Sequence, residues 1–237
     1  KSIVTPIAGT TRDSIDSFLR YNKQDFRLID TAGLRKKSKI TGDIEFYSTV
    51  RTYRVIQDCD LAAVLIDADK GFNNQDKDII RYVIDSGKGL VIVVNKWDLL
   101  DKDTHTQKEY RLDIIEEYPM LEYYPILFIS VAHNLRTREV LKISLEIYKE
   151  RQRKLKTAEF NEFIKKAMAY HTPPIINGKN ITIKYGAQVH HSPPIFALFS
   201  NHPNDIPVQY KRYLENSLRD RFGFNGVPIK ISFRENK

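Results

Sequence analysis

The first two thirds of the chain alternate between short apolar runs and stretches in which apolar residues recur at helical spacing. The short runs predict strands, and the helical spacing predicts helices. The predicted strands are 16–21, 25–30, 61–67, 90–95 and 126–130, and the predicted helices are approximately 44–57, 74–86, 106–119 and 136–154. Alternating strands and helices are typical of a mainly parallel sheet that is covered on both faces. The expected fold class of this part is α/β, with a doubly wound, mainly parallel sheet.

The last third of the chain has a different pattern. Helical spacing of apolar residues predicts helices near 160–168 and 207–222. Period-two alternation predicts strands at 181–185 and 227–233, and an apolar run predicts another at 195–199. The order α, β, β, α, β indicates a smaller α+β domain, in which the strands form one sheet that helices cover on one face.

Length and composition limit the class of protein. At 237 residues the chain exceeds the usual size of one domain, and we expect two, at 1–154 and 155–237, joined near the charged stretch 149–156. Hydrophobic residues at 41% and charged residues at 29% exclude a disordered or fibrous protein. Cys59 is the only cysteine, which excludes an internal disulfide and suits a reducing compartment. The apolar runs are shorter than the roughly 20 residues that cross a membrane, and no secretory pattern is present. We expect a cytoplasmic protein with no membrane partner.

Positive charge is concentrated in the last third. Residues 155–237 contain 12 Lys and Arg residues against 6 Asp and Glu residues. Clustered positive charge attracts phosphate backbones through counterion release, so a nucleic-acid partner is as plausible here as a basic surface kept for solubility. The basic residues considered as exposed candidates for RNA contacts are Lys165, Lys166, Lys179, Lys184, Lys211, Arg212, Arg219 and Arg221.

The most specific chemical motif is the sequence NKWD at 95–98, which follows a buried predicted strand. In open α/β sheets, ligands bind at the carboxyl ends of strands. The carboxylate of Asp98 can accept hydrogen bonds from ring N1 and the exocyclic amine of guanine, whereas adenine presents the wrong pattern of donors and acceptors. We therefore expect Asp98 to select GTP over ATP. Asn95 would brace the loop, and the aliphatic stem of Lys96 would cover the base.

Three further motifs support this interpretation. The sequence DTAG begins at Asp30, 65 residues before Asn95, and there Asp30 could hold Mg²⁺ through water while the amide of Gly33 reaches a γ-phosphate. The hydroxyl of Thr11 could complete the coordination of Mg²⁺, and the turn at 130–132 could contact guanine O6 through a backbone amide. The predicted cofactors are GTP or GDP and Mg²⁺. The residues expected to contact the nucleotide are Thr10, Thr11, Asp30, Thr31, Ala32, Gly33, Asn95, Lys96, Asp98, Ser130, Val131 and Ala132, with Thr11 and, through water, Asp30 at the metal.

The order of these motifs resembles that of the translation-factor-related GTPases, and specifically the second GTPase domain of the EngA/Der family. The matching segments are PIAGTTRD at 6–13, DTAGLRKK at 30–37, YLEN at 213–216 and FGF at 222–224. The resemblance implies a Ras-like P-loop NTPase domain followed by a smaller KH-like domain. It also implies a role in assembly of the large ribosomal subunit in bacteria. The partners that it implies are that subunit with its rRNA and a first GTPase domain of the same polypeptide, which this sequence lacks.

The sequence departs from the family pattern in three places. The phosphate-binding loop G-x-x-x-x-G-K-[ST] is absent and would be expected just before Lys1, so we expect this fragment alone to bind GTP poorly and to hydrolyse little of it. Leu34 stands where Ras-like enzymes carry the glutamine that orients the attacking water, so no catalytic residue is identified. Between its two predicted helices the last third has no Gly-x-x-Gly loop, since the sequence GFNG at 223–226 follows the second helix, which makes RNA recognition through such a loop doubtful.

Two alternatives to a GTPase stay open. The first is a non-enzymatic RNA- or protein-binding module whose GTPase half is vestigial, which a phosphate-binding loop upstream in the gene would contradict. The second is an ATPase of related fold, which Asp98 disfavours. We expect the intact protein to be a GTPase.

Overall fold

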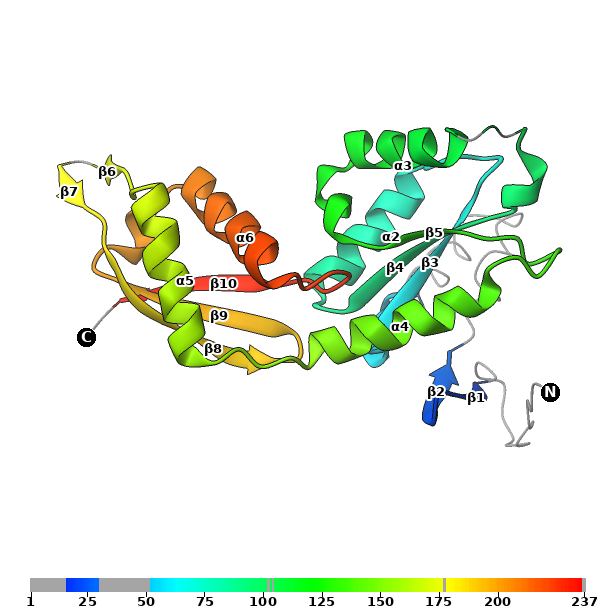
Figure 1. Cartoon of the computed structure of the whole chain (residues 1–237), viewed down its shortest axis with the longest axis horizontal. Helices are drawn as coiled ribbons and strands as arrows, with labels where there is room; N and C mark the ends of the chain where they lie inside the picture. The colour runs from blue at the N-terminus through cyan, green and yellow to red at the C-terminus, as the bar shows by residue number, and fades with distance from the viewer. Residues whose placement is uncertain (1–15, 30–51, 102, 104, 177, 236–237) are drawn as a thin grey trace. The chain divides into compact units, whose positions relative to one another are not determined.

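Two compact units make up the chain, and each is described here by itself (Figure 1). The first unit is 1–60 and the second is 61–237. The computed structural model describes residues 16–29, 52–101, 103, 105–176 and 178–235.

The described part of the first unit contains a β-hairpin. β1 (Ser17–Tyr21) pairs with β2 (Gln24–Leu28) in antiparallel register. Asn22 and Lys23 connect them, with φ angles of 48° and 63°. A two-residue turn in which both residues have positive φ matches the twist of the flanking strands. Residues 52–58 are helical, so the described end of the first predicted helix is present together with both predicted strands.

A parallel sheet forms the first half of the second unit. Its strands are β3 (Leu61–Asp67), β4 (Gly89–Asn95) and β5 (Ile126–Phe128), in the order β3-β4-β5. In β4, residues 90–94 are at most 1% exposed. A central strand that is apolar throughout is expected where both faces of a parallel sheet are covered. The predicted α/β fold class is confirmed.

Helices cover both faces of this sheet. Figure 1 shows α2 (Asn74–Asp85) and α3 (Thr106–Glu117) on one side and α4 (Thr137–Arg151) on the other. α2 begins at an N-terminal capping box, in which Asn73 accepts a hydrogen bond from the amide of Asp76 and Asp76 accepts one in return. The predicted helices at 74–86, 106–119 and 136–154 are therefore confirmed, with ends that differ by a few residues.

The second half of this unit contains a three-stranded mixed sheet. β8 (Ile183–His191) pairs antiparallel with β9 (Pro194–Ser200), and β9 pairs parallel with β10 (Lys230–Glu235). The spatial order is β10-β9-β8. β10 begins three residues after Val227, where the predicted strand starts, because 227–229 are still in the connection that follows α6.

Two helices cover one face of this sheet. In α5 (Thr157–Tyr170), Phe160 packs against Phe196 of β9, with ring centroids 4.9 Å apart and planes tilted by 36°. α6 (Val208–Phe222) begins directly after Pro207 and ends at Gly223, whose φ is +84°. These observations confirm the predicted order α, β, β, α, β. The short hairpin of β6 (Ile175–Ile176) and β7 (Lys179–Asn180) and three 3₁₀ segments, η1 (Trp97–Leu99), η2 (Pro119–Tyr123) and η3 (Pro203–Asp205), were not predicted.

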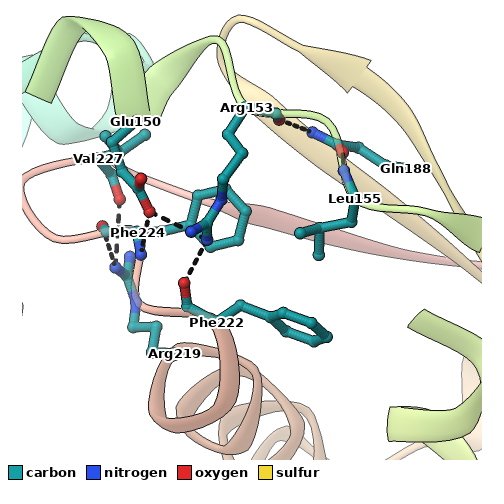
Figure 2. A network of polar contacts seen from close by, with 8 residues as sticks. All are labelled: Glu150, Arg153, Leu155, Gln188, Arg219, Phe222, Phe224 and Val227. Atoms are coloured by element: carbon teal, nitrogen blue, oxygen red, sulfur yellow. Dashed lines mark hydrogen bonds and ion pairs between the residues drawn. The ribbon is translucent and has the colours of Figure 1, made fainter. Parts of the chain in front are cut away.

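A polar network connects the end of α4 to the end of α6 (Figure 2). Glu150 Oε1 accepts a hydrogen bond from the amide of Phe224 at 2.9 Å and lies 3.0 Å from Arg153 Nη2. Arg153 also donates to the carbonyl of Phe222, and its carbonyl accepts from the side-chain amide of Gln188. The amide of Leu155 donates to Gln188 Oε1 at 2.8 Å. The segment between α4 and α5 is therefore held by β8 and by the turn after α6.

The hydrophobic core continues across the same region. Val91 of β4 and Ile147 of α4 belong to one buried cluster with residues of the second sheet and its helices, such as Phe196 and Leu214. The amide of Leu90 donates to the carbonyl of Gly226 at 2.8 Å. The division into domains at 1–154 and 155–237 stays a prediction, since the two sheets share this continuous core.

Candidate functional site

Three strand ends converge at the carboxyl edge of the parallel sheet. Asp67 ends β3 and lies in register beside Asn95, which ends β4. β5 lies next to β4 and leads into Ser130, which is fully buried. Because all three strands run in the same direction, the polar residues that follow them are brought to one edge, where such sheets bind ligands.

Asn95 ties two of the predicted motifs together. Its Oδ1 accepts a hydrogen bond from the backbone amide of Val131 at 3.1 Å. The backbone adds a second connection, from the amide of Trp97 to the carbonyl of Ile129 at 3.0 Å. The loop at 95–98 and the turn at 130–132, which are 35 residues apart in sequence, are therefore fixed to each other.

Lys96 forms an ion pair that was not predicted. Its Nζ lies 2.7 Å from Asp67 Oδ2, and its backbone is in the left-handed region with φ of 63°. The hydrogen bond from Lys96 holds the pKa of the Asp67 carboxyl below its ordinary value of 3.8, and the same bond raises the pKa of Lys96 above 10.5. Both groups are therefore charged at neutral pH, and the ion pair holds the ammonium of Lys96 at the end of β3.

The 3₁₀ turn that carries Asp98 is anchored by aromatic packing. Trp97 is 5% exposed, and its ring lies 4.5 Å from that of Phe128 and 5.5 Å from that of Tyr110. Asp98 Oδ2 lies 3.6 Å from Nε2 of His133. The buried indole fixes the position of the turn, and the neighbouring carboxylate is 21% exposed at the sheet edge.

The turn after β5 is closed by its own hydrogen bonds. The amide and carbonyl of Ser130 exchange hydrogen bonds with Leu135, and Ser130 Oγ accepts from the amide of His133 at 3.1 Å. Val131 is 58% exposed. Ser130 therefore shapes the turn. The amides of Val131 and His133 are engaged by Asn95 Oδ1 and Ser130 Oγ, and Ala132 between them is exposed.

This arrangement suits a guanine base. The edge presents a carboxylate at Asp98, a braced amide turn at 130–132 and the stem of Lys96, which together offer an acceptor for N1–H and N2–H₂, a donor for O6 and an apolar surface. An adenine would meet the carboxylate with a ring nitrogen that is itself an acceptor. The chemistry of the residues that are present fits guanine better than adenine.

The residues expected to contact the phosphates and Mg²⁺ are not among those that the structure describes. Thr10, Thr11, Asp30, Thr31, Ala32 and Gly33 lie outside the described residues. Within the described residues, no group of three or more His, Cys, Asp or Glu side chains could hold a metal ion.

Asp67 and His133 are the two residues at this edge that the sequence interpretation missed. Asp67 could have been found from its position at the end of a predicted buried strand.

One predicted RNA contact is wrong. Arg219 is 5% exposed, and its Nη1 donates to the carbonyls of Phe224 and Val227 at 3.2 Å each. Its guanidinium also lies 4.8 Å from the ring centroid of Tyr123. Arg219 is on the inner face of α6, one turn after Glu215, so it supports the turn that follows the helix instead of facing solvent.

The other seven basic candidates differ in their surroundings. Lys166 pairs with Glu162 at 2.7 Å, and Lys179 pairs with Asp205 at 3.2 Å. Lys211 is half-buried and lies over the ring of Phe233. The candidates that are fully on the surface are Lys165, Lys166, Lys179, Lys184, Arg212 and Arg221.

Comparison with known proteins identifies both parts of the chain. Residues 154–234 match a family model described as the KH-domain-like C-terminal domain of EngA bacterial GTPase enzymes, and residues 1–96 match one described as 50S ribosome-binding GTPase. GTPase Der of Amoebophilus asiaticus is 43% identical over 99% of this chain, and GTPase Der of Clostridium tetani is 44% identical over 100% of it. This chain belongs to the EngA/Der family.

The family match covers only part of those relatives. The chain spans 54% of the length of each of the two Der proteins. Among solved structures, that of Aquifex aeolicus Era Y63A bound to GDP and AlF₄⁻ covers 99% of this chain and 84% of that chain, at 17% identity and a TM-score of 0.49. In the described part of the chain, no helix combines the length and the hydrophobicity that crossing a membrane requires.

Proposed function

We propose that this chain is part of a cytoplasmic protein that binds and hydrolyses GTP and acts in assembly of the large ribosomal subunit. The observation that carries the guanine part of the proposal is the hydrogen bond from the Val131 amide to Asn95 Oδ1. This bond fixes the turn at 130–132 beside the loop that carries Asp98. Membership of the EngA/Der family and the match to a 50S ribosome-binding GTPase model support the ribosomal part.

Each residue of the edge has a definite task in this proposal. Asp98 accepts hydrogen bonds from N1 and N2 of guanine, and the amide of Ala132 donates to O6. Lys96 covers one face of the base with its stem while its ammonium remains paired with Asp67. Asn95 and Ser130 act through their hydrogen bonds within the two loops, which set the distance between the Asp98 carboxylate and the Ala132 amide.

The proposal extends to the residues outside the described part. Thr10, Thr11 and the segment 30–33 would contact the phosphates, with Thr11 and, through water, Asp30 at Mg²⁺. When bound, Mg²⁺ supplies positive charge that neutralises the phosphate oxygens. The domains would be 1–154 for the nucleotide and 155–237 for the KH-like part, which would face the rRNA.

Calorimetry tests the nucleotide part. We would titrate GTP, GDP and ATP into this chain and into a longer form that continues upstream of Lys1 through the sequence G-x-x-x-x-G-K-[ST]. We expect Mg²⁺-dependent binding of GTP and GDP in the longer form, weaker binding in this chain and no binding of ATP. If neither form bound a guanine nucleotide, the alternative of a binding module with a vestigial GTPase half would replace this proposal.

A further inference from the structure

The face of the second sheet that α5 and α6 leave open carries an aromatic stack. Phe196 of β9 points to the helices, because its ring lies 4.9 Å from that of Phe160 in α5. Leu198 points the same way, because a Cβ added at Gly186 would meet Leu198 together with Ile164 and Phe160 of α5. Side chains alternate along a strand, so the intervening residues of β9 and their partners in register lie on the other face. These nine residues are Tyr185, Ala187 and His190 of β8, Ile195, Ala197 and Phe199 of β9, and Lys230, Ser232 and Arg234 of β10. We call them the open sheet face.

Tyr185 and Phe199 are directly opposite each other on this face. Their ring centroids are 4.5 Å apart and their planes differ by 16°. That spacing is close to the distance between neighbouring strands, about 4.8 Å, so the rings are stacked along the direction from strand to strand. β8 is an edge strand of the three, and Tyr185 is 44% exposed. The outer side of the Tyr185 ring can therefore receive one more flat group.

The charged residues of the open sheet face, Lys230 and Arg234, are both basic, and Glu235 beside Arg234 alternates to the other face. Arg234 lies in register with Phe199 on its other side and is exposed. Lys184 is the extra residue at a bulge next to Tyr185 and is also exposed. None of the nine residues of the open sheet face is acidic. An aromatic stack on a sheet face that carries cations and no carboxylate matches the requirements of single-stranded nucleic acid, which stacks its bases and needs its phosphates neutralised.

The helical side of the same region is less suitable. The hollow between α5 and α6 is lined by Lys166, Arg212 and Arg221 but also by three carboxylates. One of them, Glu162, already pairs with Lys166. A phosphate there would replace an existing ion pair, whereas on the open sheet face it would meet cations without competing acids.

We propose that the open sheet face binds single-stranded RNA, with one base stacked on the outer side of Tyr185 and neighbouring phosphates at Arg234 and Lys184. The proposal deepens the proposed function and rests on it for the choice of RNA as the nucleic acid. It does not use the nucleotide-binding edge.

Fluorescence anisotropy with a labelled ten-nucleotide single-stranded RNA, on the full 237-residue chain and without guanine nucleotide, tests the stack. We expect Tyr185→Ala to weaken binding about 5- to 150-fold, because base stacking on an aromatic ring contributes that much per base. Tyr185→Phe keeps the ring and should bind within about twofold of the unchanged chain. Tyr170→Ala is the matched control, since Tyr170 is 89% exposed on α5, outside the open sheet face.

A second variant tests the phosphate contact through the dependence on salt. Arg234→Gln should reduce the slope of log affinity against log salt by about 0.7, the value for one phosphate contact on a single strand. Arg221→Gln, at the end of α6, should leave the slope unchanged. If Tyr170→Ala or Arg221→Gln weakened binding while the Tyr185 and Arg234 variants did not, the site would be on the helices and the proposal would be overturned.

Other occupants of this face give different results. If the chain bound no single-stranded RNA, the proposal would fail. If Tyr185→Ala changed only self-association in sedimentation, the face would be an interface between copies of the chain and the proposal would also fail. Failure of GTP binding in calorimetry together with a Tyr185-dependent RNA affinity would overturn the proposed nucleotide function and leave this inference standing.

Discussion

The side-chain carboxylate of Glu150 accepts a hydrogen bond from the backbone amide of Phe224, at 2.9 Å, across 74 positions of sequence. Glu150 is in the last turn of α4, and Phe224 follows α6 by two residues. Figure 2 shows how this bond and the Arg153 side chain together connect the end of one helix to the turn after the other. The family segment FGF at 222–224 therefore has a structural role in this contact.

Removing the Glu150 carboxylate should destabilise the fold. Glu150→Ala leaves the Phe224 amide without this acceptor and Arg153 without its charge partner, which should lower the free energy of unfolding by about 1–3 kcal/mol. Glu150→Gln retains an acceptor oxygen and should cost less. Urea unfolding measures both, with Glu146→Ala on the exposed side of α4 as control. Equal stability of the alanine variant and the unchanged chain would show that water replaces the carboxylate.

Arg219→Ala should be more damaging than the loss of any exposed cation. Two backbone carbonyls lose a charged donor, and Glu215 loses its partner in the helix, at a cost of about 3 kcal/mol. Arg221→Ala, two residues later and exposed, should change stability by less than about 0.5 kcal/mol. Thermal unfolding of the two variants compares them directly. A stable Arg219→Ala chain with weaker RNA binding would restore Arg219 as an RNA contact.

Gly226 should not tolerate a side chain. Its φ is +73°, and an added Cβ would lie 2.6 Å from Ile147 Cγ1 and 3.2 Å from the Leu90 carbonyl oxygen. Backbone strain and overpacking together should lower the free energy of unfolding by about 2–5 kcal/mol in Gly226→Ala. Gly71 separates the two effects, because its φ is +71° and an added Cβ would have nothing within 4 Å. Gly71→Ala should therefore cost only about 1–2 kcal/mol, and similar losses for both variants would contradict the packing argument.

Asp98→Asn should change the preferred base. The carboxamide can still accept from N1–H, but its NH₂ now faces the guanine amine, whereas it can donate to the oxygen at position 2 of xanthine. In the longer form that continues upstream of Lys1, GTP affinity should fall at least about 100-fold, the value of one to two charge-assisted hydrogen bonds, and XTP should bind in its place. Calorimetry with both nucleotides measures this exchange. Unchanged preference for GTP would show that another group recognises the base.

The Asp67–Lys96 pair should make stability depend on acid pH. The pKa of Asp67 is lowered in the folded chain, so its contribution is fully present above its unfolded value of 3.8 and is lost as pH falls through the lower folded value. Asp67→Asn should therefore be less stable than the unchanged chain at pH 7, with the difference shrinking below about pH 4. Asp78→Asn, exposed on α2, provides the comparison. A difference that grew toward pH 3 would have the wrong sign for this pair.

Periodicity predicted the longer helices and strands of the described residues, but not the short β6–β7 hairpin, the 3₁₀ segments or the contacts between elements. The apolar run of β4 and the alternation in β8 gave the two sheets, because a buried strand and a half-buried strand require those patterns. The position of Asp98 after β4 followed from the rule for parallel sheets. Nothing in the sequence pairs Lys96 with Asp67 or Glu150 with Phe224, since these contacts depend on how distant segments come together. Arg219 was misassigned for the same reason, because an arginine on a helix gives no sign that its guanidinium faces inward.

β4 sets a fixed interval between the loop that carries Asp98 and the turn that contains Gly226. At one end the Leu90 amide is bound to Gly226, and at the other Asn95 positions the turn at 130–132. Five residue steps at about 3.3 Å each separate Leu90 from Asn95 by roughly 17 Å, and residues 89–94 of the strand are buried. Such a strand neither stretches nor bends appreciably. A displacement of the loop that holds Asp98 would therefore move the whole strand, and with it the Gly226 turn. A single residue inserted into β4 would turn every following side chain to the opposite face of the sheet.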